Sequence, residues 1–200
     1  MHRPLCLCVA IKNKRGNYDV MEPKDRLKPV TGFRSSRRIL PHFELPGSIY
    51  YVTFSTIDRF ILYDSAKDIV LSSFRFHNGK KYLLHVCVIM DDHAHCILQP
   101  MRVSKKVQAQ RPVQLKPLVQ PVEYYSLAQI THSIKSYSAN YIQKMLNYKK
   151  RIWQDENFDR IIRDEEEYTQ KTNYIIYNPV KSGFVEKPED YRWLFFGNRL

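Results

Sequence analysis

The segment His93-Ala94-His95 carries the pair of side chains best suited to chemistry in this sequence. In an extended strand, residues two apart point to the same face, so both imidazoles can approach one ion. A neutral imidazole nitrogen suits a borderline divalent cation such as Mn²⁺. Two histidines do not complete a metal site, and with seven histidines in the chain such a pair also arises by chance. An ordinary half-buried histidine pair therefore stays the alternative.

A predicted helix near the C-terminus offers further groups. Tyr174 and Asn178 are four residues apart, so they share one face of that helix. Asn178 can supply an amide oxygen to the ion, and Tyr174 can place a phenol beside it. Only about one tyrosine hydroxyl in a thousand is ionised at neutral pH, a shortfall of roughly 4 kcal/mol that a cation next to a substrate phosphate offsets. The alternative is that Tyr174 only packs between helix and sheet, as most of the 14 tyrosines must.

Basic and aromatic residues precede this helix. Arg160 and Arg163 can hold phosphates through bidentate guanidinium contacts, or Arg163 can instead pair with one of the surface glutamates at 165–167. Trp153 and Gln154 can stack on a base or hydrogen-bond to it. A tryptophan buried in the core fits the same position equally well.

The elements that must position these residues follow from hydrophobic periodicity and from turn residues. We expect strands at 49–55, 82–90 and 93–99, a β-like stretch at 151–162, and helices at 65–77, at 127–145 and from Asp164 to near Asn178, before Pro179. Lys135 lies on the polar face of the second helix. This order predicts an α+β fold, an antiparallel sheet with helices packed on one face.

The domain organisation follows from where the charge lies. Residues 1–40 hold ten Lys or Arg and three Asp or Glu, with several prolines and glycines, which predicts a flexible basic N-terminal arm. An upstream extension without a role is the alternative for this segment. We expect a single catalytic domain over residues 41–197, with a Pro- and Lys-rich internal loop at 101–122.

The composition points to a polyanionic partner inside the cell. The formal net charge is +12, from 32 Lys and Arg against 20 Asp and Glu, which makes nucleic acid the first partner to consider. The longest apolar run, 83–90, is too short to span a bilayer, so we expect no membrane association. Four cysteines are too few for a disulfide scaffold, and no cleavage site follows the apolar residues 5–11. We therefore expect a cytoplasmic, nucleoid-associated protein.

Several motifs, in their order along the chain, resemble those of the REP-associated tyrosine transposases, a family of HUH single-strand transposases. The segment 88–96 is similar to the family's histidine–hydrophobic–histidine motif. The segments 153–163, 174–183 and 188–193 are similar to its later motifs, and 38–43 is similar to its opening. The likeness covers roughly residues 37–194. Ordered motifs are more specific than the histidine pair alone, so they reverse the balance in favour of a metal site.

The resemblance implies a ferredoxin-like or RRM-like antiparallel sheet and a DNA strand transferase. In this reading His93, His95 and Asn178 bind Mg²⁺ or Mn²⁺, and Tyr174 attacks a phosphodiester of single-stranded DNA. The attack gives a 5′-phosphotyrosyl enzyme and a free 3′-hydroxyl, and a later attack by another 3′-hydroxyl rejoins the strands. The implied partner is single-stranded or hairpin DNA, bound by a monomer or a homodimer. The expected nucleic-acid ligands are Arg160, Arg163, Trp153, Gln154, Lys135 and Lys181.

The chain also departs from the family pattern. Ile176 stands where the family often has a histidine, and the segment 101–122 is longer than usual. These departures leave the DNA sequence that is read open. The alternative function is a non-catalytic single-stranded nucleic-acid-binding protein, because an RRM-like sheet with exposed aromatics can bind bases by stacking alone. A replication initiator or relaxase is a third reading, for which we expect a further module that 200 residues cannot hold.

Overall fold

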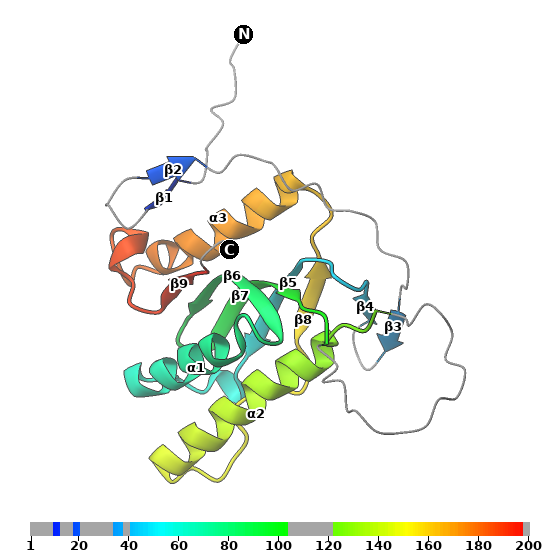
Figure 1. The fold of residues 1–200 in the computed structure, drawn as a ribbon. Coiled ribbons are helices and arrows are strands. Elements are labelled where there is room, and N and C mark those ends of the chain that lie inside the picture. The colour runs from blue at the N-terminus through cyan, green and yellow to red at the C-terminus, as the bar shows by residue number, and fades with distance from the viewer. Residues whose placement is uncertain (1–9, 13–17, 21–33, 38–40, 104–121, 198–200) are drawn as a thin grey trace, which may run out of the picture.

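A five-stranded antiparallel sheet with the strand order β8-β5-β7-β6-β9 forms the centre of the fold (Figure 1). The computed structural model describes residues 10–12, 18–20, 34–37, 41–103 and 122–197. The strands of this sheet are β5 (Tyr50–Ser55), β6 (Tyr82–Ile89), β7 (His93–Pro100), β8 (Phe158–Ile161) and β9 (Leu194–Phe196). The helices are α1 (Asp64–His77), α2 (Leu127–Leu146) and α3 (Glu165–Lys181).

The order of elements confirms the predicted α+β class. From β5 to β8 the chain runs β-α-β-β-α-β with β5 and β7 in the middle of the sheet, which is the ferredoxin-like arrangement. The three predicted strands and the first two helices agree with the structure to within about two residues, the usual uncertainty of element ends. Asp91 and Asp92 join β6 to β7 as the predicted hairpin turn.

The helices cover both faces of the sheet. Phe54 of β5 stacks on Phe74 of α1 with 5.6 Å between ring centroids, and the ammonium of Lys135 in α2 lies 5.4 Å from the Phe54 ring. Tyr51 projects from the other face of β5 and meets Tyr174 of α3. The prediction that all helices pack on one face is therefore wrong. Periodicity shows that a helix has an apolar side, but it does not show which face of the sheet that side covers.

Helix α3 begins as predicted and ends later. The carboxylate of Asp164 caps it by accepting a hydrogen bond from the Glu167 backbone N–H at 2.8 Å. The predicted end near Asn178 is wrong, because the helix passes through Pro179 and ends at Lys181. A proline costs one helical hydrogen bond and disfavours helix in the residue before it. Here Pro179 is buried in the last turn, so packing against the fold carries the helix further.

The other predicted segments agree only in part. The β-like stretch at 151–162 is a strand only in β8, although Trp153 forms an isolated bridge with Thr56. Two short antiparallel pairs lie before the central sheet: β1 (Ala10–Lys12) with β2 (Tyr18–Val20), and β3 (Arg34–Arg37) with β4 (Pro41–Glu44).

Two of the predicted regions lie largely outside the described residues. These are most of the predicted basic arm at 1–40 and positions 104–121 of the predicted loop at 101–122, so both stay predictions. Within the described ranges, every helix is too short or too polar to cross a lipid bilayer.

Candidate functional site

The two histidines project side by side from the sheet face that α3 covers. His93 and His95 occupy alternate positions at the start of β7, and their ring centroids are 4.7 Å apart. Ala94 and Cys96 point to the opposite face and are fully buried there. The alternation predicted from the sequence is therefore present, and it places both imidazoles where they can reach one ion.

His93 is oriented by the residue that precedes it. Its Nδ1 lies 2.6 Å from Oδ1 of Asp92 in the hairpin turn. A carboxylate only accepts hydrogen bonds, so Nδ1 carries the proton and donates it. In the neutral ring this bond leaves Nε2 with the lone pair, the arrangement common among metal-bound histidines whose other nitrogen bonds a carboxylate.

His95 is held by two hydroxyls of β5. Its Nδ1 lies 2.8 Å from Oγ1 of Thr53 and 2.9 Å from the hydroxyl of Tyr51. When Nδ1 donates its proton to these hydroxyl oxygens, Nε2 keeps the lone pair that a metal ligand needs. The ring is buried. Burial, reinforced by the charges of His93 and Lys171, lowers the pKa of His95 to about 3. A neutral ring is the form that binds metals.

Tyr174 of α3 lies directly above His95. Its ring centroid is 5.2 Å from that of His95 and 6.4 Å from that of Tyr51. The two phenols differ in environment, since Tyr174 is 41% exposed whereas burial raises the pKa of Tyr51 to about 12. The ammonium of Lys181 is 5.8 Å from the Tyr174 ring, and that of Lys171 is 4.9 Å from the Tyr51 ring. An accessible phenol thus lies over His95, with the ammonium of Lys181 beside its ring.

Asn178 lies one turn beyond Tyr174 on the same side of α3 and is buried. Across the ranges that the structure describes, no third His, Cys, Asp or Glu joins the histidines in a group that could hold a metal. The types of the three predicted donors suit a divalent cation. These donors are two imidazole Nε2 atoms fixed through their Nδ1 bonds and an amide oxygen on the helix above them.

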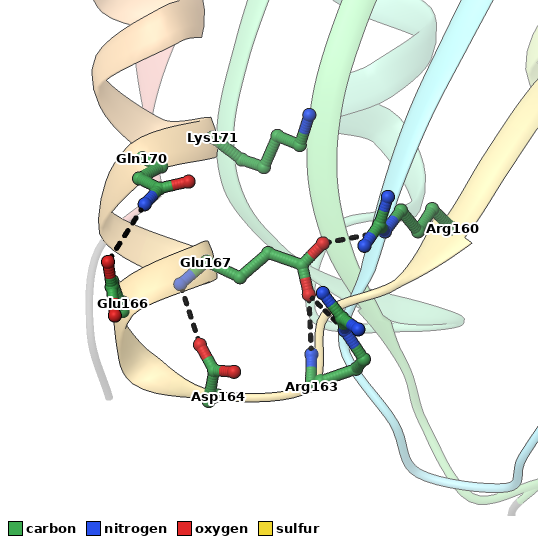
Figure 2. A pocket seen from close by; sticks show the side chains of 7 residues that line it. All are labelled: Arg160, Arg163, Asp164, Glu166, Glu167, Gln170 and Lys171. Carbon is green, nitrogen blue, oxygen red and sulfur yellow. Dashed lines mark hydrogen bonds and ion pairs between the residues drawn. The ribbon is translucent and has the colours of Figure 1, made fainter.

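Arg160 and Arg163 converge on one carboxylate, as Figure 2 shows. Nε of Arg160 lies 2.6 Å from Oε1 of Glu167, and Nε of Arg163 lies 3.0 Å from Oε2. The alternative that Arg163 pairs with a glutamate at 165–167 is confirmed, although the side chain of Glu167 is only 8% exposed rather than a surface group. Burial alone raises the pKa of Glu167, but the hydrogen bonds from Arg163 and the charge of Arg160 outweigh it and lower the pKa.

Of the other predicted nucleic-acid ligands, Lys181 lies beside Tyr174, whereas Trp153, Gln154 and Lys135 make contacts within the fold. Trp153 is 5% exposed and its indole N–H donates to Ser138 of α2, so the buried-core alternative is the one that the structure shows. The ring has no open face for a base, and the prediction of stacking is wrong. The ammonium of Lys135 donates to the backbone carbonyls of residues 154–156 and closes that loop. Gln154 is exposed, and its side-chain amide donates to the carbonyl of Thr56.

Sequence reasoning missed the residues that orient the histidines. Tyr51 and Thr53 lie opposite the histidine strand only because β5 pairs with β7 in this register. Lys171 reaches the site because the helix stripe of Glu167, Lys171 and Tyr174 crosses the sheet. Asp92 was the one detectable signal, since a carboxylate next to a histidine is visible in the sequence.

Comparisons with known proteins support the family resemblance. No family model matches the chain. A Haemophilus influenzae protein named as a candidate REP-associated tyrosine transposase is 28% identical over 109 residues, which are 54% of this chain and 55% of that protein. The chain thus matches about half the length of this curated relative.

Two solved structures also resemble the chain. One is a REP-associated tyrosine transposase bound to a REP hairpin, with a TM-score of 0.58 and 18% identity over 80% of this chain and 82% of that one. The other is a candidate transposase from Deinococcus radiodurans, with a TM-score of 0.40 and 17% identity over 66% of this chain and 91% of that one. The first shares the fold, and the second is too dissimilar to support an argument.

Proposed function

We propose that this chain, which resembles the REP-associated tyrosine transposases in sequence and in fold, is a metal-dependent transposase that cuts and rejoins single-stranded DNA through Tyr174. One observation carries the proposal. The exposed phenol of Tyr174 lies over His95. Each histidine of the pair makes a hydrogen bond within the protein through Nδ1, so both Nε2 atoms are left for an ion.

The ion would be Mg²⁺ or Mn²⁺, held by Nε2 of His93, Nε2 of His95 and the amide oxygen of Asn178. When bound, it supplies Lewis-acid stabilisation of the charge that develops on the scissile phosphate. The chain itself keeps the ligands in place: Asp92 orients His93, and the hydroxyls of β5 orient His95. Lys171 and Lys181 lie where they can attract and align the DNA backbone.

Burial decides which tyrosine is the nucleophile. Tyr51 and Tyr174 both contact His95. The hydroxyl of Tyr51, however, is hydrogen-bonded to Nδ1 of His95, and burial raises the pKa of Tyr51 to about 12. Tyr174 is accessible to a bound strand. In the proposed reaction its oxygen bonds to phosphorus, the phenol loses its proton, and the P–O3′ bond breaks to release a 3′-hydroxyl. A second 3′-hydroxyl then attacks the same phosphorus, and the phenol leaves with a proton.

The proposed substrate is hairpin DNA with single-stranded flanks. A solved structure with the same fold is bound to a REP hairpin, and the net charge of +12 suits a polyanion. Within one chain Tyr174 lies over its own His95, which supports a site assembled from a single copy. A cytoplasmic location near the nucleoid would place the protein with this substrate.

The covalent adduct tests the proposal. The full chain is incubated with Mn²⁺ and a hairpin DNA labelled on the 3′ side of the expected cut, and run on a denaturing gel. We expect a protein–DNA adduct that Tyr174→Phe abolishes while binding persists. Tyr177→Phe, which alters another exposed tyrosine of α3, is the control and should keep the adduct. Replacing His93 and His95 by Ala should also stop cleavage.

Two results would contradict the proposal. An adduct in Tyr174→Phe would place the nucleophile elsewhere, and full cleavage without the two histidines would remove the metal site. DNA binding that never yields an adduct would support the non-catalytic single-strand binder instead. For about five neutralised phosphates, log affinity should fall with log salt with a slope near roughly −3.5.

A further inference from the structure

Three aromatic rings form an exposed row on the surface of α1 and α2, which we call the aromatic ladder: Phe76, Tyr137 and Tyr141. Phe76 and Tyr137 are nearly parallel, with an interplanar angle of 7° and 6.3 Å between centroids, and Tyr137 lies 4.5 Å from Tyr141. Their exposed fractions are 57%, 39% and 52%. Large rings gain free energy by burial, so a row of three in water is a surface suited to a partner.

The charges beside the ladder select the partner. Segments 69–81 and 126–151, which carry the three rings, contain no Asp or Glu. The ammonium of Lys80 lies 4.3 Å from the Phe76 ring, and that of Lys81 donates to Ser133 of α2 at 2.9 Å. Lys144 is exposed and lies two turns after Tyr137, on the same stripe of α2. A basic, aromatic surface complements a polyanion that also has flat apolar faces.

The ladder is separate from the histidine site. Helices α1 and α2 lie on one side of the sheet and α3 on the other (Figure 1). His93, His95 and Tyr174 belong to the α3 side. The sheet itself lies between the two regions. A contact made at the ladder therefore plays no part in the chemistry at Tyr174.

We propose that the aromatic ladder is a second nucleic-acid contact for a single strand, whose unpaired bases stack on the exposed ring of Tyr141 and pack against the exposed parts of Tyr137 and Phe76. Lys80 and Lys144 flank the row and would neutralise the phosphates of that strand. Each stacked base adds affinity without sequence preference, because every base offers a π-face. Paired bases within a duplex cannot stack in this way, so the surface would select single-stranded over double-stranded DNA.

A protein partner fits the same surface less well. The ladder consists of rings flanked by lysines, and among the described residues the large exposed aliphatic side chains of its two helices are Met145 and Leu146, at its end. A second copy of the chain would present the same positive charges, and like charges in opposition disfavour a symmetric contact.

Binding of an unstructured strand tests the inference with no cleavage step. The probe is a fluorescent oligothymidylate of about 20 nucleotides, longer than one typical single-strand site, measured by anisotropy with the full chain. We expect Tyr141→Ala to weaken binding about fivefold or more, the equivalent of one lost base stack. Tyr141→Phe keeps the ring and should bind like the wild type. Tyr63→Ala, which removes another exposed tyrosine, is the matched control and should change nothing.

A second measurement uses the unaltered protein. Photocrosslinking to an oligonucleotide that contains iododeoxyuridine should give adducts in the peptides of Phe76, Tyr137 and Tyr141. Three results would overturn the inference: unchanged oligothymidylate affinity in Tyr141→Ala, an equal loss for a blunt duplex, or crosslinks confined to other peptides. A change of oligomeric state without a change in binding would mark the ladder as a protein interface instead. None of these readouts depends on the nucleophile or on a metal.

Discussion

Replacing Lys67 by methionine should make the protein easier to unfold, because this lysine is a buried cation paired closely with Asp91 and, at 3.9 Å, with the exposed carboxylate of Asp64. Its ammonium lies 2.6 Å from Oδ1 of Asp91, and its side chain is only 7% exposed. It also lies 4.4 Å from the Trp193 ring, so the charge is enclosed by an aromatic face. Methionine keeps the length of the stem and a favourable contact between sulfur and the ring, so the variant chiefly removes the charge.

The expected cost follows from these contacts. Removing one partner of a fully buried ion pair costs about 3–5 kcal/mol, but the Asp91 side chain is 35% exposed and can regain water. The loss of a hydrogen bond to a charged group sets the lower scale, about 1.5–3 kcal/mol. We therefore expect Lys67→Met to lower the free energy of unfolding by about 2–3 kcal/mol. For a chain of this size, this loss corresponds to a midpoint of thermal unfolding about 4–12 °C lower.

Urea unfolding, monitored by circular dichroism, measures this change in the free energy of unfolding. The control is Lys187→Met, the same substitution at an exposed lysine, which should stay within about 0.5 kcal/mol of the wild type. Asp91→Asn and the double variant complete a cycle whose interaction energy should be at least about 1 kcal/mol. Two results would refute the role given to this ion pair. One is a double-mutant cycle with no interaction energy, and the other is a urea midpoint of Lys67→Met equal to that of Lys187→Met.

Three further outcomes follow from buried groups. Glu167→Gln frees the two arginines that the carboxylate holds, so they can contact DNA phosphates. The slope of log affinity against log salt should then steepen by roughly 0.7 for each phosphate gained. Glu166→Gln makes the same charge change on an exposed side chain and should leave this slope unaltered. The pKa of Glu167 is held below its usual 4.5, so its ionised form stabilises the fold above that pH. This stabilisation is lost as the pH falls, so the free energies of unfolding of the wild type and of Glu167→Gln, measured against pH, should converge at acid pH. Burial raises the pKa of both Cys87 and Cys96, so iodoacetamide should label these thiols, as mapped by mass spectrometry, only after denaturation.

Local signals in the sequence were enough to predict the elements of the fold. Runs of β-branched, aromatic and other apolar residues bounded by turn residues predicted β5, β6 and β7, and helical spacing predicted α1 and α2. The capping residue Asp164 predicted where α3 begins. The proximity of His93 and His95 was also predictable, because residues two apart in a strand share a face whatever the rest of the chain does.

The resemblance to a family selected Tyr174 among 14 tyrosines, which periodicity alone did not. The structure then supplied a physical distinction that no local pattern contains. Tyr51 and Tyr174 both reach His95, but burial raises the pKa of the first, whereas the second is partly open to solvent.

Contacts between distant segments were decided only by tertiary structure. The strand register brought the hydroxyls of β5 to His95, and the choice of sheet face brought Tyr174 over it. The same three-dimensional packing buried Trp153 and carried α3 through Pro179. A sequence specifies period, caps and turns through neighbours a few residues apart. Which faces meet depends on the packing of the whole chain. In this protein that packing determines which phenols lie beside the histidine pair and which of them is open to solvent.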